Sequence, residues 1–200
     1  MKNQNRDAAR RRAKQNNSEG KNNPLDAIVV YCTGNGTTMQ YAEWISEELN
    51  CDIVPYSRKH LAYVSMYRNV IFGGWIRTGE INKLNMLRQN AANFNLDSKN
   101  VIVFGVGIAP ESEEYVEYLR YQNGISDNVE FHFLPGKYDP NKVSLTASTA
   151  LKAVSGTMFN CMDTESADEM RRRFEEGWDG VDIDRIHPIT DSIIKKTFEG

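Results

Sequence analysis

Residues 28–49 read IVVYCTGNGTTMQYAEWISEEL, and this stretch decides the fold of the chain. It begins with an apolar run at 28–31, which predicts a strand buried on both faces. A bend rich in glycine and hydroxyl groups follows at 32–38. Apolar residues then recur at spacings of three and four, as in an amphipathic helix: Met39, Ala42, Ile45 and Leu49. We therefore predict a strand that turns tightly into a helix.

The bend at 32–38 has the composition of an anion site. A tight turn from a strand into a helix points several backbone N–H groups, and the positive end of the helix dipole, at one spot. The hydroxyl groups of Thr33, Thr37 and Thr38 add further donors. Thr37 followed three residues later by Gln40 also fits a capping box. The stretch predicts a site for a phosphate monoester, although an ordinary turn between a strand and a helix has the same outline.

Two other phosphate motifs fit this stretch less well. A P-loop has Lys-Ser or Lys-Thr after its glycines, and no lysine occurs between Pro24 and Lys59. A dinucleotide fingerprint reads G-x-G-x-x-G, but the two glycines Gly34 and Gly36 are followed by Met39 at the third glycine position. Neither a nucleotide triphosphate nor a dinucleotide is therefore the expected ligand.

The rest of the chain alternates predicted strands with predicted helices. Strands are expected at 52–56, 69–74, 101–106 and 129–134. Ser57 is expected to cap a short helix, a longer helix uses Leu84, Leu87, Ala91 and Phe94, and the last helix spans 188–198 with Ile189, Ile193 and Phe198 facing inward. Strands separated by helices indicate right-handed crossovers and a parallel sheet. Residues 136–185 remain as an insertion with a charged helix at 165–176 and an apolar part, 143–159, too short to span a bilayer.

Two motifs carry a resemblance to a known family. Residues 31–38, YCTGNGTT, resemble the loop that binds the phosphate of FMN in flavodoxins. Residues 71–79, IFGGWIRTG, are similar to the G-x-x-I-R-x-G segment of the flavodoxin-domain group that includes menaquinone-dependent protoporphyrinogen oxidase. The resemblance covers roughly residues 27–196. It implies a flavodoxin-like α/β fold with a doubly wound, five-stranded parallel sheet in the order 2-1-3-4-5, a helical insertion after strand 5, and FMN as the cofactor.

In such a sheet, ligands bind at the carboxyl ends of the strands, where the strand order reverses between strands 1 and 3. The loops 32–38, 75–80 and 107–110 are therefore expected to converge. The predicted cofactor-binding residues are Cys32, Thr33, Gly34, Asn35, Gly36, Thr37, Thr38, Gly74, Trp75, Ile76, Arg77, Thr78, Gly79, Val106, Gly107, Ile108 and Ala109.

Several of these residues have two interpretations. Trp75 either stacks on the isoalloxazine ring, as the resemblance suggests, or packs against its own chain. Arg77 either lies near the pyrimidine end of the flavin, where it would raise the potential, or pairs with Glu80 at the surface. Cys32 lies where a helix dipole would lower the pKa of its thiol, and it is either a small packed residue or a reactive group. Glycines at 73, 74 and 79 would let the backbone approach the ring.

Composition limits the class of protein. Two hundred residues suit one domain, which we place at 25–200. Residues 1–24 carry seven basic groups against two acidic ones and no aromatic residue, which predicts a disordered basic tail, either solvated or in contact with RNA or an anionic surface. The formal net charge is −3, so the remaining body is acidic and nucleic acid is not expected as the main partner.

The cysteines and histidines indicate compartment and metal use. The three cysteines have no C-x-x-C spacing, which suits a reducing compartment, and we expect a cytoplasmic protein. No apolar run approaches the ~20 residues of a transmembrane helix, and no secretory signal is recognisable. The three histidines lack ligand spacing, so no metal site is expected.

Three functions are compatible with these residues. We favour an FMN-binding, flavodoxin-like redox protein that exchanges electrons with a partner protein or a small acceptor such as a quinone. The second is an enzyme resembling quinone-dependent protoporphyrinogen oxidase, which passes hydrogen from a tetrapyrrole precursor to FMN and then to menaquinone. The third is a flavin-free fold used for protein binding. Three docking sites are compatible with the apolar part of the insertion: a membrane surface, a partner protein, or its own domain.

Overall fold

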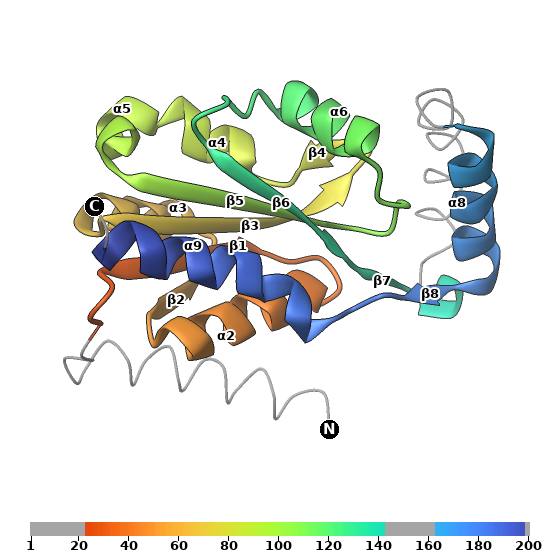
Figure 1. Cartoon of the computed structure of the whole chain (residues 1–200), viewed down its shortest axis with the longest axis horizontal. Helices are drawn as coiled ribbons and strands as arrows, with labels where there is room; N and C mark the ends of the chain where they lie inside the picture. Colours follow the sequence, from red (N-terminus) through yellow and green to blue (C-terminus); the bar gives the residue numbers. More distant parts are fainter. Residues whose placement is uncertain (1–22, 143–162, 199–200) are drawn as a thin grey trace.

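The computed structural model describes residues 23–142 and 163–198 and has an α/β fold built on a six-stranded sheet (Figure 1). Five strands run parallel in the order β2-β1-β3-β5-β6, and a short strand, β4, pairs antiparallel with β3. The strands are β1 (Ala27–Cys32), β2 (Asp52–Pro55), β3 (Asn69–Arg77), β4 (Glu80–Ile81), β5 (Asn100–Gly107) and β6 (Glu130–Pro135). With β5 and β6 counted as the fourth and fifth parallel strands, this order confirms the predicted 2-1-3-4-5 flavodoxin-like arrangement.

Helices cover both faces of the sheet (Figure 1). One face carries α2 (Thr37–Leu49), η4 (Ile183–Ile186) and α9 (His187–Phe198). The other face carries α3 (Arg58–Leu61), η1 (Ala62–Met66), α4 (Leu84–Gln89), α5 (Ala91–Phe94), η2 (Leu96–Ser98) and α6 (Glu113–Asn123). The predicted cap of the short helix is confirmed, because the Ser57 side chain accepts a hydrogen bond from the His60 N–H at 3.0 Å.

Strand β1 is buried between the two layers of helices and contributes to the apolar core on both faces of the sheet. Its residues alternate between the two faces: Val29 joins the cluster under α2 and α9, whereas Ile28 and Val30 join the cluster on the opposite face. All three side chains are fully buried. A continuous apolar run is what a strand covered on both faces requires, so the prediction for residues 28–31 is confirmed.

The insertion begins directly after β6. It contains β7 (Lys137–Tyr138), η3 (Pro140–Lys142), α8 (Thr164–Glu176) and β8 (Trp178–Asp179). Because β7 pairs antiparallel with β8, the two ends of the insertion lie side by side. The predicted helix at 165–176 is confirmed as α8. The apolar segment 143–159 and all but the last two residues of the predicted basic tail lie outside the described residues. None of the described helices is long and apolar enough to cross a membrane.

The loop predicted at 75–80 is instead mostly strand. β3 continues to Arg77, a two-residue turn follows, and β4 then pairs back on β3. The turn residues Thr78 and Gly79 have φ angles of 53° and 81°. A two-residue turn with positive φ at both positions matches the twist of antiparallel strands and closes a tight hairpin. Threonine rarely adopts a positive φ, so the presence of Thr78 at this position does not suggest a turn.

The long helix predicted after this hairpin is broken in two at Asn90. The Asn90 side chain donates from Nδ2 to the Met86 carbonyl at 2.8 Å, and its backbone N–H bonds instead to the Leu87 carbonyl. An asparagine side chain that takes the carbonyl four residues back competes with the α-helical hydrogen bond. This competition breaks the helix at Asn90, and the spacing of apolar residues does not predict such a break.

The last helix, α9, confirms two of its three predicted inward residues. Ile189 and Ile193 are fully buried, but Phe198 is 71% exposed, so that part of the prediction is wrong. The inward-facing row continues at a spacing of four to half-buried Thr197, whose hydroxyl accepts a hydrogen bond from the Asn69 side chain at 3.1 Å. Phe198 is one residue further and therefore points about 100° away from that row.

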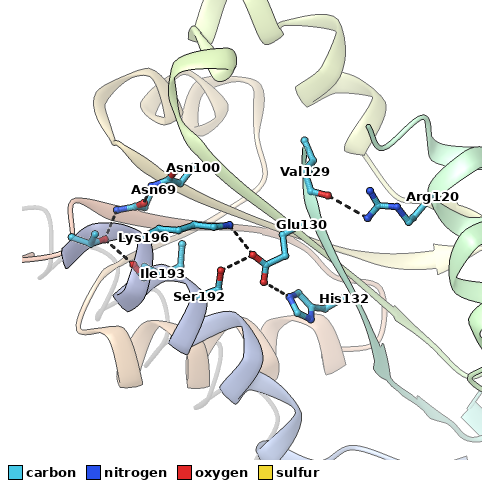
Figure 2. Close-up of polar contacts among 10 residues, drawn as sticks. Asn69, Asn100, Arg120, Val129, Glu130, His132, Ser192, Ile193 and Lys196 are labelled. Carbon is cyan, nitrogen blue, oxygen red and sulfur yellow. Dashed lines mark hydrogen bonds and ion pairs between the residues drawn. The ribbon is translucent and has the colours of Figure 1, made fainter. Parts of the chain in front are cut away.

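A carboxylate on the edge strand fastens α9 to the sheet (Figure 2). Glu130 of β6 accepts hydrogen bonds from Ser192 Oγ at 2.5 Å, Lys196 Nζ at 2.7 Å and His132 Nε2 at 2.7 Å. Partial burial alone would raise the pKa of Glu130, but the hydrogen bonds from His132, Lys196 and Ser192 outweigh it and lower the pKa to about 2. The carboxylate is therefore the form that the folded protein prefers.

This arrangement predicts how acid affects stability. A depressed folded-state pKa adds stability above the ordinary value of 4.5, and that stability is lost as the pH falls toward about 2. Glu130→Gln should therefore lower the free energy of unfolding by about 1 kcal/mol at pH 7, after allowance for solvent screening. The difference from the parent should shrink between pH 4.5 and pH 3 in urea unfolding. The control is Glu117→Gln, whose carboxylate is 76% exposed; a difference for Glu130→Gln that does not change with pH would contradict the assignment.

Candidate functional site

The turn between β1 and α2 is closed by a glycine in the left-handed region. Gly36 is the N-cap of α2, with φ 102°, and as a glycine it has no side chain to cap the helix. The predicted capping box is therefore wrong, because Thr37 is the first helical residue and lies inside the turn that it was expected to cap. Glycine adopts this left-handed conformation at little cost, and because Gly36 has no side chain it satisfies none of the N–H groups in the first turn of α2.

Two side chains of this turn fix its shape from within. The Gly36 N–H donates to Thr33 Oγ1 at 3.0 Å, and the Thr37 N–H donates to Asn35 Oδ1 at 3.2 Å. Asn35 also donates from Nδ2 to the carbonyl of Lys137, at the start of the insertion, at 2.8 Å. Thr33 and Asn35 thus hold the turn, and their acceptor atoms face its own backbone N–H groups.

Thr38 is different from its neighbours. Its side chain is fully buried in the first turn of α2, and its hydroxyl has no hydrogen-bond partner among the described residues. A buried polar group without a partner is rare in native proteins, because it loses its bonds to water without replacing them. A helix N-terminus that carries a free hydroxyl is a donor set that suits a phosphate group.

The β3–β4 hairpin lies against this turn. A Cβ atom built on Gly34 would lie 3.4 Å from the Trp75 indole, so the ring lies directly beside this glycine. Cys32 Sγ donates to Asn82 Oδ1 at 3.3 Å, and the Asn82 N–H donates to the Trp75 carbonyl at 2.9 Å. The structure therefore brings the first two predicted loops together, and half-buried Trp75 packs on the glycine of the turn.

The charged residues of the hairpin lie at the surface. Arg77 and Glu80 are opposite each other in the β3–β4 register, and both are exposed. Within residues 23–142 and 163–198 no ion pair joins their side chains. Arg77 is therefore an exposed residue without the expected ion pair to Glu80, and its approach to a flavin stays a prediction.

The third predicted loop follows β5 on the same edge of the sheet. β1, β3 and β5 are adjacent and parallel, so their carboxyl ends leave the sheet side by side. The Gly107 carbonyl accepts a hydrogen bond from the Gly136 N–H at 2.6 Å, and Arg173 Nη1 of α8 donates to the Ile108 carbonyl at 2.8 Å. Val106 and Ala109 are buried. This loop therefore contacts the insertion as well as the sheet.

The glycines of β3 and its turn make room for side chains of this chain. A Cβ on Gly73 would meet the Phe104 ring at 2.0 Å, and one on Gly74 would meet the Ile81 side chain at 2.6 Å. A Cβ on Gly79 would lie 2.6 Å from the Tyr118 hydroxyl. These contacts with other parts of the chain are enough to explain why each position is glycine, and no flavin is needed for that explanation. The approach of a flavin to this backbone stays a prediction.

The expected lowering of the Cys32 pKa by the helix dipole is wrong in direction, and the packed interpretation of this residue is the one that fits. Partial burial raises the pKa of the Cys32 thiol, and the nearby Lys83 ammonium lowers it by a smaller amount. Because the thiol also donates to Asn82, the neutral form is the one held in place. Cys32 is therefore a packed residue, and the alternative of a reactive thiol is not supported.

Sequence reasoning missed four residues at this edge of the sheet. Asn82 and Asn123 hold the hairpin, and Arg173 of α8 lies over the Trp178 ring at 3.7 Å from its centroid. Single asparagines and arginines leave no periodic signal, so only the folded arrangement reveals them. Among the described residues, no group of three or more His, Cys, Asp or Glu side chains has the geometry of a metal site.

Comparison with known proteins decides the family. The family profile described as flavodoxin domain matches residues 28–160, which is more than half of the chain. This chain belongs to the flavodoxin-domain family. The match does not extend to the narrower protoporphyrinogen oxidase group that the sequence motifs suggest. No match was found among curated proteins.

Solved structures similar to this flavodoxin-domain protein include three flavodoxins. A flavodoxin from Streptococcus pneumoniae is 16% identical, with 75% of this chain and 95% of that chain covered and a TM-score of 0.40. A flavodoxin from the domain Archaea is 16% identical, with 72% and 98% covered and a TM-score of 0.34. Flavodoxin 1 from Bacillus cereus is 11% identical, with 66% and 96% covered and a TM-score of 0.36.

Proposed function

We propose that this protein is an FMN-binding, flavodoxin-like redox protein that passes electrons to or from a partner protein or a small acceptor such as a quinone. The observation that carries the proposal is the Thr38 hydroxyl, which is buried at the N-terminus of α2 without a hydrogen-bond partner among the described residues. The FMN phosphate would supply that missing acceptor. Family membership supports a flavin-binding redox protein at a coarser level.

The residues present fit the phosphate of FMN. Thr37 and Thr38 lie in the first turn of α2, where backbone N–H groups have no intrahelical acceptor. Thr33 and Asn35 hold the shape of the turn by accepting hydrogen bonds from the N–H groups of Gly36 and Thr37. The positive end of the helix dipole favours the negative charge of the phosphate. Thr38 would donate its hydroxyl, and the backbone would donate beside it.

The other two loops would contact the flavin ring. When bound, FMN supplies one- and two-electron redox chemistry that side chains lack. Trp75, which already lies against Gly34, would border the ring beside the phosphate turn. Val106 and Ala109 would present buried apolar surface on the β5 side and exclude water there. Arg77 is exposed at the hairpin and available to an acceptor or a partner protein.

A second candidate is an FMN-dependent enzyme of the quinone-dependent protoporphyrinogen oxidase type. The observation that favours it is the insertion, which contacts the turn through Asn35 and the β5 loop through Ile108. An element packed on both loops could bind a substrate next to the flavin. Assays with a porphyrinogen donor and menaquinone separate this enzyme from an electron carrier.

A flavin-free binding protein on the same fold is the third possibility. It would leave the Thr38 hydroxyl buried without a reason, which is why we place it last. We also propose a cytoplasmic location, which the free thiol of Cys32 supports because reduced cysteines are typical of that compartment.

The test of the proposal is a titration with FMN and with riboflavin. The two ligands share the ring system and differ by the phosphate, so only FMN can use Thr38. Preferential binding of FMN is expected; equal affinity for both would remove the phosphate site from the proposal.

A further inference from the structure

Asn123, the last residue of α6, makes hydrogen bonds with every polar group of its side chain. Its Oδ1 accepts from the Ile81 N–H at 2.7 Å, and its Nδ2 donates to the carbonyls of Gly79 and Leu119, each at 2.8 Å. The side chain is buried, with 7% of the residue exposed. An amide has two N–H donors, and here both are used. Two of the three partners, Gly79 in the turn and Ile81 in β4, belong to the β3–β4 hairpin.

The hairpin needs such support from outside. β4 has two residues, and an isolated two-stranded hairpin is at best marginally stable in water. The turn also holds Thr78 at a φ of 53°, a left-handed conformation that strains a residue other than glycine. Tyr118 of α6 lies against Gly79 from the same side as Asn123. Figure 1 shows α6 beside β4, on the face of the sheet opposite to α9.

The other end of the hairpin reaches the candidate phosphate turn. Asn82, directly after β4, donates its N–H to the Trp75 carbonyl at 2.9 Å and accepts from Cys32 Sγ at 3.3 Å. The Trp75 indole in turn lies on Gly34. A continuous series of contacts therefore leads from Asn123 through β4 to Trp75.

We infer that Asn123 is a positioning residue for the flavin site: it holds the hairpin in the place that sets Trp75 beside the phosphate turn. The inference rests on the proposed function for its ligand, but its contacts belong to the protein alone. The hydrogen bonds of the Asn123 side chain do not reach the phosphate turn at 32–38; they act on the site through Gly79, β4 and Asn82.

The test replaces Asn123 by aspartate, which has almost the same shape. Asn123→Asp loses both donations and places a carboxylate oxygen against the carbonyls of Gly79 and Leu119, so the turn should move away from α6. We expect the Kd for FMN to rise about tenfold, which is typical of coupling through intermediate residues. The visible circular dichroism of bound FMN should also change, because this signal reports the surroundings of the ring. The matched control is Asn128→Asp, an exposed residue of the loop before β6, which should leave both measurements unchanged.

A second variant covers the case in which Asn123→Asp does not fold. Gly79→Ala pushes the turn away from Tyr118 and strains a φ of 81°, while Asn123 stays intact, and it should weaken FMN binding in the same way. Folded variants that bind FMN with the parent affinity and the parent spectrum would overturn the positioning role and leave the proposed function standing. A parent protein that binds no FMN would overturn the proposed function, and the flavin role of Asn123 with it.

Discussion

Thr38→Glu should abolish FMN binding under conditions in which the parent is saturated. Thr38 is fully buried in the first turn of α2, so a carboxylate there cannot move far from the phosphate. Two unit charges about 4 Å apart repel by about 4 kcal/mol near a protein surface, so the Kd should rise by about 100-fold or more. Fluorescence titration of flavin-free protein with FMN measures the change.

Thr38→Val is the matched variant for this prediction. Valine keeps the branched shape and removes only the hydroxyl, which has no partner among the described residues. It should therefore bind FMN about tenfold more weakly, through the loss of one hydrogen bond to a charged group. Without FMN it should be at least as stable as the parent, because replacing an unsatisfied buried hydroxyl by a methyl group removes a desolvation penalty. An undiminished FMN affinity in Thr38→Val and Thr38→Glu would remove this residue from the site.

Gly73→Ala should be the most damaging small substitution in the sheet. The added Cβ would lie 2.0 Å from Cζ of Phe104, whose side chain is fully buried on the adjacent strand and has nowhere to move. Overpacking of this kind costs about 3 kcal/mol. For a protein of this size the Tm should fall by about 10 °C, as measured by thermal unfolding.

A double-mutant cycle identifies the cause. Gly73→Ala combined with Phe104→Leu should cost less than the two single changes added together, because leucine leaves space for the new methyl group. The control is Gly34→Ala, whose Cβ would make an ordinary contact of 3.4 Å with Trp75. If Gly73→Ala is as stable as the parent, Phe104 does not occupy the space beside Gly73.

The sequence predicts the elements whose signal is periodic. The run at 28–31, the helix that buries Ala42 and Ile45, and the charged helix at 165–176 all appear where expected. Burial of a strand or of one helix face requires apolar residues at a fixed spacing, so this information is local. The strand order came from the resemblance, since periodicity does not determine which strands are neighbours.

The errors in the predicted secondary structure arise where a single side chain or a single φ angle determines the local conformation. The hairpin depends on left-handed Thr78 and Gly79, and the break at Asn90 depends on one competing hydrogen bond. Glycine itself is ambiguous: Gly73 could admit a ligand or a neighbouring ring, and the structure shows the ring of Phe104 beside it. Phe104 lies on another strand, so its contact with Gly73 cannot be deduced from the spacing of residues.

The same limit applies to the candidate site. The turn at 32–38 was recognisable because its donors are consecutive in sequence. That Thr38, and not Thr33, has the free hydroxyl depends on the φ of Gly36 and on the bond between Thr33 and the Gly36 N–H. Asn123 lies more than forty residues from the hairpin that it holds.

The central claim is that this flavodoxin-domain protein binds FMN through the phosphate turn and uses it as a redox group. The most direct measurement is the absorbance spectrum of the purified protein, recorded before and after addition of FMN and then of dithionite, with riboflavin as the phosphate-free comparison. We expect bound FMN to show shifted flavin bands that bleach on reduction, and riboflavin to bind about 100-fold more weakly because it lacks the charged phosphate. A colourless protein that FMN cannot reconstitute would contradict the claim and favour a flavin-free binding module on the same fold.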